Sequence, residues 1–167
     1  VLLDVRSPLE YRENHLIGLY IRMLQFLARF SPGAKTLRVW LHRLRGVKVG
    51  KRVWIGYDAI IETSCPYLVK IRDDAVVGIR ATIIAHFREY EGVDIGEGAV
   101  IGPGAIVLPN VKIGRGAVVT AGSVVTRSVP PMTLVQGNPA QPVAKVGVML
   151  GLDTPMQEFS THLKPLR

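Results

Sequence analysis

The sequence repeats every six residues from Ile71 onward. The units Ile95-Gly96-Glu97-Gly98-Ala99-Val100 and Ile101-Gly102-Pro103-Gly104-Ala105-Ile106 follow each other directly. An aliphatic residue opens almost every unit, at positions 71, 77, 83, 95, 101, 107, 113, 119 and 125. An amphipathic helix needs apolar residues about every 3.6 positions and a half-buried strand every second position, so neither explains this period. A six-residue period predicts a parallel β-helix, in which each unit is one short strand and a turn.

The residue types within each unit agree with this fold. The first position is nearly always Ile or Val, whose branched side chains favour strands, and we expect it to point into a narrow core. The second position is often Gly, which tolerates turn dihedrals that other residues avoid. The fifth position is small, because a large side chain there would collide with the next coil: Ala59, Cys65, Ala75, Ala81, Ala99, Ala105, Ala117 and Ser123.

The repeat is interrupted twice. An earlier series, Val49, Ile55 and Ile61, ends ten residues before Ile71, so residues 65–68 are predicted to form a bulge or corner. Inside the main series, Glu89 stands where an aliphatic residue is expected. Residues 87–92 are therefore predicted to leave the column as a loop, directly after His86.

The segment ahead of the repeat, residues 1–46, is predicted to form a helical cap. Ser7, Pro8 and Glu10 have the spacing of a helix start. One apolar helical face follows, and a second short helix ends at Gly46: Leu16, Leu19, Met23, Leu27 and Phe30, then Leu37, Trp40, Leu41 and Leu44. Arg22, Arg29, Arg38, Arg43 and Arg45 decorate these helices. Either the pair closes the open end of the column, or it touches anionic lipid or a lipid-linked substrate.

The rest of the chain divides into residues 47–146, the repeat domain, and residues 147–167, a helical tail. In the tail, Pro155 is predicted to occupy the first helical position, with Met156, Phe159 and Leu163 on one face that packs on the column or on a neighbouring subunit.

The net charge of +8 lies ahead of the main repeat. Residues 1–52 contain 11 Lys and Arg against three Asp and Glu, whereas residues 53–167 contain 10 of each sign. A basic chain can indicate nucleic-acid binding, but this repeat region is neutral and has no basic stripe with interleaved aromatic residues. We therefore expect no nucleic-acid partner.

The segment from Val49 to Val143 resembles the hexapeptide-repeat acyltransferases, whose fold is a left-handed parallel β-helix. The run from Gly122 to Pro131, followed by Gly137-Asn138-Pro139-Ala140, resembles in particular the closing coil of sugar and xenobiotic O-acetyltransferases. The resemblance implies an acetyl-CoA-dependent enzyme that forms a homotrimer with active sites between subunits. The expected location is cytoplasmic, with a peripheral membrane contact through the basic helices as an addition.

His86 is the one histidine of the repeat region, and it lies directly before the predicted loop. In the family that the chain resembles, a histidine in this position is the general base. An acceptor hydroxyl must lose its proton as it attacks the thioester carbonyl of acetyl-CoA, and an imidazole with its ordinary pKa of about 6.5 can take that proton near neutral pH. On spacing alone, a surface turn residue is an equal explanation.

The resemblance also implies where the acetyl donor binds. Backbone groups of the later coils and basic residues are the candidates: Gly104, Ala105, Ala121, Gly122, Thr126, Arg127 and Lys145. Arg127 or Lys145 is expected to meet the 3′-phosphate. Because Pro103 has no N–H, the amide of Gly104 is the expected donor to the thioester oxygen.

For the acceptor, we expect a sugar, a glycan or a lipid-linked saccharide, with Glu62, Arg80 and Glu89 as candidate binding residues. Glu89 is also a candidate for orienting the His86 imidazole. Two alternatives stay open at this point: an N-acyltransferase that acts on an amino sugar or another amine, and a β-helix that serves as a non-catalytic scaffold.

No metal is expected. A catalytic zinc site needs about three protein ligands, and the repeat region offers one histidine and one cysteine, Cys65. A lone cysteine at a small position of the repeat is best explained as a buried structural thiol.

Overall fold

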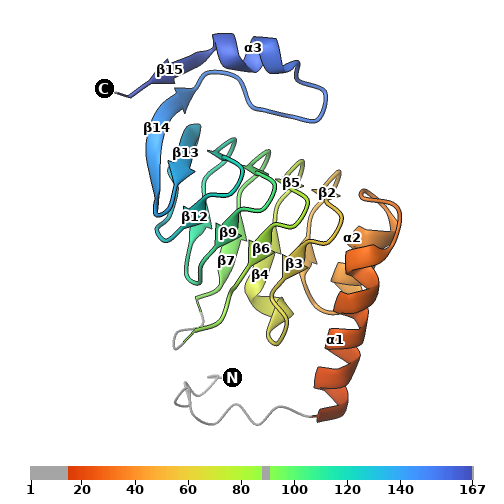
Figure 1. Ribbon diagram of the computed structural model, residues 1–167. Coiled ribbons are helices and arrows are strands. Elements are labelled where there is room, and N and C mark those ends of the chain that lie inside the picture. Colours follow the sequence, from red (N-terminus) through yellow and green to blue (C-terminus); the bar gives the residue numbers. More distant parts are fainter. Residues whose placement is uncertain (1–14, 88–90, 167) are drawn as a thin grey trace, which may run out of the picture.

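The computed structural model describes residues 15–87 and 91–166. It is a column of stacked coils with two helices at one end and a small hairpin and helix over one side (Figure 1). The predicted helix start at Ser7, Pro8 and Glu10 lies outside the described residues, and so does Glu89, where the repeat is interrupted. The predicted β-helix with an N-terminal helical cap and a short C-terminal helix is confirmed.

Three parallel sheets form the walls of the column, and each coil contributes one strand to each. The first wall, sheet A, contains β1 (Lys48–Val49), β4 (Val69–Ile71), β7 (Val93–Ile95) and β10 (Lys112–Ile113). The column part of sheet B contains β2 (Trp54–Ile55), β5 (Val76–Val77), β8 (Val100–Ile101) and β11 (Val118–Val119). Sheet C contains β3 (Ile60–Ile61), β6 (Thr82–Ile83), β9 (Ile106–Val107) and β12 (Val124–Val125).

The first and fifth positions of the repeat line the interior, as predicted. The first-position residues from Ile55 onward are buried and form one continuous cluster that includes Ile61, Ile83 and Ile101, and the partly buried Val49 packs against it. All eight small residues of the fifth position are buried as well. The core is therefore a stack of aliphatic side chains that each coil shares with its two neighbours.

The glycines of the second position have a different role from the one predicted. A Cβ atom added to Gly102 would lie 2.5 Å from the backbone nitrogen of Ala121 in the next coil. Close stacking, and not unusual dihedrals, thus requires glycine there. The left-handed dihedrals occur at the fourth position, for example at Gly104 (φ 66°) and Asn110 (φ 62°).

The register of the sheets locates the two interruptions. Partner residues in sheet A are 22 positions apart for Lys48 and Lys70, 24 for Lys70 and Asp94, and 18 for Asp94 and Lys112. Three uninterrupted units make the 18-residue spacing, so the longer coils carry insertions. The first insertion contains the short 3-10 helix η2 (Pro66–Leu68), at the predicted corner, and the second follows β6, after His86.

The cap consists of α1 (His15–Phe30) and α2 (Leu37–Leu44). Backbone N–H groups of each coil donate to carbonyls of the next coil, as from Trp54 to Ala75 and from Ile60 to Ala81. At the alternating positions, backbone groups of the first coil face the cap instead: the N–H of Ile55 donates to the carbonyl of Ala34 at 2.9 Å, and the carbonyls of Ile55, Ala59 and Ile61 also point out of the column. Without partners there, this edge would carry a row of unsatisfied acceptors.

Cap side chains supply the missing donors. Arg38 donates to the carbonyl of Ile55, and Gln25 donates to that of Ala59 at 3.2 Å. Arg45 donates to the carbonyls of Ile61 and Glu62, the latter at 2.7 and 2.6 Å. Arg38 and Arg45 are buried, so the prediction that they decorate the helix surface is wrong.

The predicted apolar face of the first helix points outward. The stripe of α1 that packs inward contains Gly18, Leu24, Gln25 and Ala28, whereas Leu16, Leu19, Met23, Leu27 and Phe30 are exposed. The helix is apolar nearly all round, so its sequence pattern did not single out the packed side. In the described parts of the chain, no helix is long and apolar enough to cross a bilayer.

The end of the chain extends sheet B. Strand β13 (Thr133–Gly137) joins β11 in parallel, and β14 (Ala140–Val146) and β15 (Leu163–Pro165) continue the sheet in antiparallel fashion. Between them, α3 (Met156–Thr161) begins after Pro155, which is the N-cap and not the first helical residue. Phe159 is buried, but Met156 is exposed and Leu163 lies on β15, so the predicted three-residue helix face is wrong.

One consequence of the cap packing is a pH-dependent stability. Burial lowers the pKa of His42 to about 3, and the positive charges of Arg45 and Arg38 add to this effect. Because the folded-state pKa is below the unfolded value of about 6.5, the unfolded chain binds an extra proton between these limits. Stability from this residue is complete above pH 6.5 and is lost as the pH falls toward 3.

We expect the free energy of unfolding to fall by up to about 1.4 kcal/mol per pH unit through this residue as the medium is acidified below pH 6. Urea unfolding of the wild type and His42→Leu between pH 6.5 and 4.5 measures the slope. The variant should show a flatter dependence. Equal slopes would contradict the assignment to His42.

Candidate active site

A buried carboxylate and an accessible imidazole meet at the corner where sheet C strands lead into sheet A strands. Glu62 directly follows β3, and His86 follows β6 in the next coil, where Ile61 pairs with Ile83. The Glu62 Oε1 atom lies 2.7 Å from His86 Nδ1. The β-helix register thus brings together two residues that are 24 positions apart.

Glu62 is held rigidly. Its side chain is about 1% exposed. Its Oε1 accepts hydrogen bonds from the backbone N–H groups of Ser64 (2.8 Å) and Cys65 (3.1 Å). Its Oε2 accepts from those of Ala85 (2.7 Å) and His86 (3.2 Å). Its φ of 23° lies in a region that L residues avoid, and such strain is often concentrated at functional sites.

The environment keeps this carboxylate ionised. Burial would raise the pKa of Glu62, but hydrogen bonds from the His86 ring and from the N–H groups of Ser64, Ala85 and Cys65 outweigh burial and lower it. A fixed negative charge therefore faces the imidazole at neutral pH.

This contact determines the tautomer of His86. An ionised carboxylate can only accept, so Nδ1 carries the proton that it donates to Glu62. Nε2 then keeps its lone pair. The His86 side chain is 40% exposed, so this nitrogen is accessible to an external proton donor. The arrangement is that of a general base held by a carboxylate.

The other predicted residues lie in separate places within one chain. Gly104, Ala105, Ala121 and Gly122 occupy the corner between sheets B and C, where Gly122 donates to the carbonyl of Pro103 at 2.9 Å. A Cβ atom added to Gly104 or Gly122 would meet nothing within 4 Å, so this corner offers open space. Ala105 is buried, and only its backbone faces outward.

The Gly104 amide, the expected donor to the thioester oxygen, makes a hydrogen bond within the chain. That N–H already donates to the carbonyl of Ile79 at 2.9 Å, as part of the stacking of the corners. Its hydrogen is therefore committed within the chain.

Thr126 and Arg127 are exposed at the same type of corner as His86, beyond β12. Lys145 lies elsewhere, on β14, where its Nζ donates to Thr133 Oγ1 at 3.1 Å. The chain alone thus brings Arg127, and not Lys145, to an edge of sheet C.

The three predicted acceptor residues do not gather around the imidazole. Arg80 is at the corner between sheets B and C, with its Nε 3.6 Å from Asp58 Oδ2. Glu89 lies outside the described residues. Glu62 does contact His86, but it is buried and satisfied by five hydrogen bonds, so it positions the imidazole and has no free face for an acceptor.

The outer face of sheet C connects the two corners. Its outward side chains form an in-register ladder of Ile60, Thr82, Ile106 and Val124. All four are only partly buried. By contrast, Val118 of sheet B is covered by Leu134, Ala144 and Phe159 of the C-terminal segment. Sheet C is thus an apolar wall that this chain leaves open to a ligand or a second subunit.

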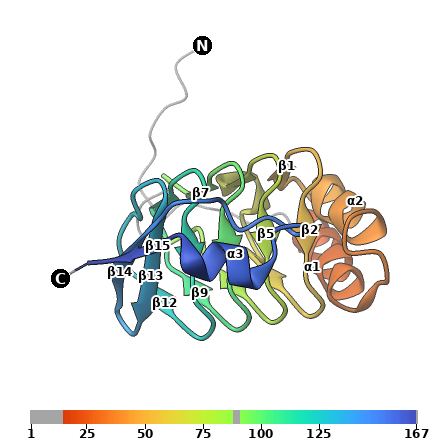
Figure 2. The ribbon, with the colours of Figure 1, turned by 90° about the horizontal axis from the view of Figure 1, so that it is seen from above.

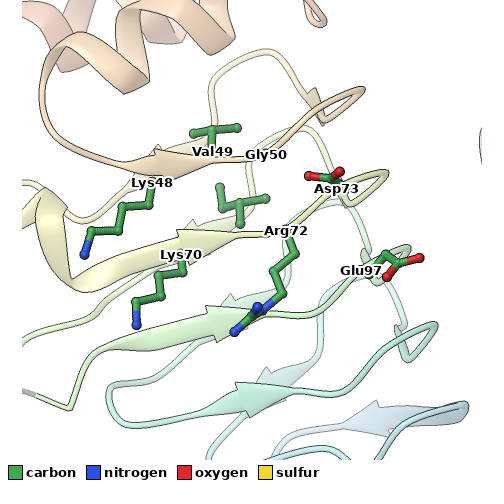
Figure 3. A pocket seen from close by; sticks show the side chains of 8 residues that line it. Lys48, Val49, Gly50, Lys70, Arg72, Asp73 and Glu97 are labelled. Atoms are coloured by element: carbon green, nitrogen blue, oxygen red, sulfur yellow. The ribbon is translucent and has the colours of Figure 1, made fainter.

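A shallow groove of about 580 Å³ lies on the outer face of sheet A, and the sequence did not reveal it. Lys48 and Lys70 are register partners there and extend side by side from neighbouring strands (Figure 3). Arg72 pairs with Asp94 at 2.6 Å. The sequence pattern that could have located this groove is that Lys48 and Lys70 each directly precede a first-position aliphatic residue, Val49 or Ile71, so both lysines face outward from the same sheet.

Among residues 15–87 and 91–166, no group of three His, Cys, Asp or Glu is close enough to hold a metal ion.

Comparisons with known proteins agree with the geometry. The family described as bacterial transferase hexapeptide (six repeats) matches residues 92–127, and the hexapeptide repeat of succinyl-transferase matches residues 68–109. YvoF of Bacillus subtilis, which is named an acetyltransferase, is 38% identical over 122 residues, which cover 68% of this chain and 69% of that protein. The chain belongs to the hexapeptide-repeat acetyltransferases.

Two further relatives extend this result. This acetyltransferase is 33% identical to a serine acetyltransferase of Staphylococcus aureus over 154 residues, which cover 86% of the chain and 67% of the relative. Among solved structures, a hexapeptide-repeat acetyltransferase from Vibrio cholerae in complex with acetyl coenzyme A matches with a TM-score of 0.63 and 21% identity, over 81% of this chain and 90% of that one. The second likeness supports the fold.

Proposed function

We propose that this acetyltransferase moves an acetyl group from acetyl-CoA to a hydroxyl group of a saccharide-type acceptor, with His86 as the general base. The His86–Glu62 pair carries the proposal. Its fixed Nδ1–H and free Nε2 are what the deprotonation of a hydroxyl requires, and an amine, which is already nucleophilic when neutral, has less need of them.

The reaction balances with these groups. The acceptor hydroxyl gives its proton to His86 Nε2 while its oxygen forms a bond to the acetyl carbonyl carbon. The carbon–sulfur bond then breaks, and the imidazolium returns the proton to the leaving thiolate. The products are an acetyl ester and CoA. Glu62 stabilises the transient imidazolium through its negative charge at 2.7 Å.

The donor fits the outer face of sheet C. The open corner at Gly104 and Gly122 lies on one side of the apolar wall, and Arg127 lies on the other. An apolar, narrow acyl-pantetheine chain suits the ladder of Ile60, Thr82, Ile106 and Val124, and Arg127 would bind a phosphate. We infer that a neighbouring column closes this face, which makes the active unit a homotrimer with sites between subunits.

An acceptor panel with acetyl-CoA tests the proposal. Thiol release should require a hydroxyl acceptor, and the product should gain one acetyl mass that mild base removes. A base-stable product would support the N-acyltransferase alternative. If the protein neither binds CoA nor releases thiol with any acceptor, the scaffold alternative replaces the proposal.

A second acceptor class has a specific observation in its favour. The similarity to a serine acetyltransferase extends over 86% of this chain. Serine also presents a hydroxyl group, so the same base would serve. The panel should include serine beside mono- and oligosaccharides, and the ratio of kcat/KM values decides between them.

The role of Glu62 gives a separate prediction. In Glu62→Gln the side chain keeps one oxygen, but its NH2 group must face backbone N–H donors, so His86 loses both its charge partner and its orientation. We expect kcat to fall by about 10- to 100-fold, with the KM for acetyl-CoA unchanged. Adding Glu62→Gln to His86→Ala should cost little more, because both changes disable one unit. Fully multiplicative losses would show that Glu62 acts independently of His86.

A further inference from the structure

We propose that the outer face of the cap helices α1 and α2 binds the surface of an anionic phospholipid bilayer. This face is formed by Leu16, Leu19, Tyr20, Met23, Phe26, Leu27 and Phe30 of α1 with Leu37, Trp40 and Leu44 of α2. All ten side chains are between 41% and 78% exposed. Isolated exposed apolar residues are common on proteins, but a contiguous set of this size marks an interaction surface.

The geometry of the helices makes the face continuous. Both helices turn narrow stripes inward and pack on each other through Leu24, Ala28 and Leu41. Outward positions on α1 and on α2 recur at helical spacing, so each helix presents one apolar strip. Aromatic rings connect α1 to the column corner: Phe26 to Phe30 at 5.3 Å, and Phe30 to Tyr57 at 5.7 Å.

The positive charge of the cap indicates which partner binds this apolar face. Residues 15–52 contain nine Lys and Arg and no Asp or Glu. Arg38 and Arg45 are buried beneath the helices, while Arg22, Lys35 and Arg43 are exposed. Arg29 and Arg52 are paired with Asp58 and Asp74, but the other basic residues leave this end strongly positive. An apolar strip with aromatic residues in such a setting matches an anionic bilayer, which accepts the side chains and attracts the cations. A second copy of this face would instead bring like charges together.

The position of the cap also suits a flat surface. Both helices cover one end of the column, and the hairpin of β13 and β14 lies at the opposite end (Figures 1 and 2). In a ring of side-by-side columns, all three caps would lie at the same end. Three faces would then contact one plane together and strengthen binding by multivalency. The lipid contact itself does not depend on the catalytic proposal.

Sedimentation with lipid vesicles tests this inference. The full chain should sediment with vesicles that contain phosphatidylglycerol and much less with pure phosphatidylcholine, and added salt should weaken the association. The double variant Leu19→Glu, Phe26→Glu should bind at least about tenfold more weakly. Met156→Glu, an equally exposed apolar residue on α3, should bind like the wild type.

Fluorescence adds a readout at the face itself. Trp40 is 53% exposed, so its emission should shift to the blue on anionic vesicles, and the shift should persist in Trp54→Phe but not in Trp40→Phe. Failure of the wild type to bind anionic vesicles overturns the proposal. So does a double variant that binds vesicles normally but has a smaller oligomeric mass than the wild type, because the face would then join subunits.

Discussion

His86→Ala should lower kcat for thiol release from acetyl-CoA by about 10²- to 10⁴-fold, which is the usual contribution of a general base. The acceptor hydroxyl would then have no group to take its proton, while the apolar wall of sheet C and the exposed Arg127 remain. The KM for acetyl-CoA should therefore change little. Steady-state kinetics with saturating acceptor, supported by direct binding of CoA, measure both quantities.

His162→Ala provides the matched control. This histidine is exposed near the end of α3, with its ring against the carbonyl of Glu158 at 2.8 Å. Its removal should leave kcat unchanged. If His86→Ala keeps more than a tenth of the wild-type kcat, another group takes the proton and the proposed mechanism fails.

The largest expected loss of stability comes from Arg45→Met. The buried guanidinium serves the carbonyls of Ile61 and Glu62 at the open edge of the column. Burial lowers its pKa to about 10, against the opposing effect of Glu62, so it is charged at neutral pH. Methionine keeps the apolar stem and removes every donor. Two buried acceptors would lose their partners, and we expect the free energy of unfolding to fall by about 2–5 kcal/mol.

Urea unfolding at pH 7 measures this loss, and Arg115→Met is the control. Arg115 forms an exposed ion pair with Glu97 at 3.5 Å, so its loss should cost less than about 1 kcal/mol. Because Arg45 holds the backbone of Glu62, Arg45→Met should also lower kcat under conditions where the variant is folded. Equal stabilities of the two variants would mean that the arginine donors do not seal the edge.

The first and fifth positions of the repeat could be predicted from the sequence because their constraint is local. Ile83 must fit a narrow core and Ala81 must clear the next coil, whatever the rest of the chain does. The second position was predicted for the wrong reason. Gly102 is required by the approach of Ala121, 19 residues later, and such a contact depends on the stacking of two coils.

The candidate site also contains residues that the sequence predicted and residues whose roles depend on the tertiary structure. His86 stood out because it precedes an interruption of the repeat. Glu62 was identified, but as an acceptor-binding residue, because its burial and its contact with His86 depend on the pairing of β3 with β6, 22 residues apart, which the first insertion sets. The sequence also gave no reason to separate Lys145 from Arg127, since a hairpin carries Lys145 to sheet B.

The sequence by itself determined the column, because a six-residue period imposes the same short-range packing on every unit. It also singled out the one histidine of the repeat. Only the tertiary structure decided what surrounds that histidine and how the column begins. The partners of Glu62, and the arginines that donate to the first coil, come from distant segments, and their positions depend on how many residues each coil contains. The repeat therefore specifies the scaffold, and the insertions and the cap specify the site.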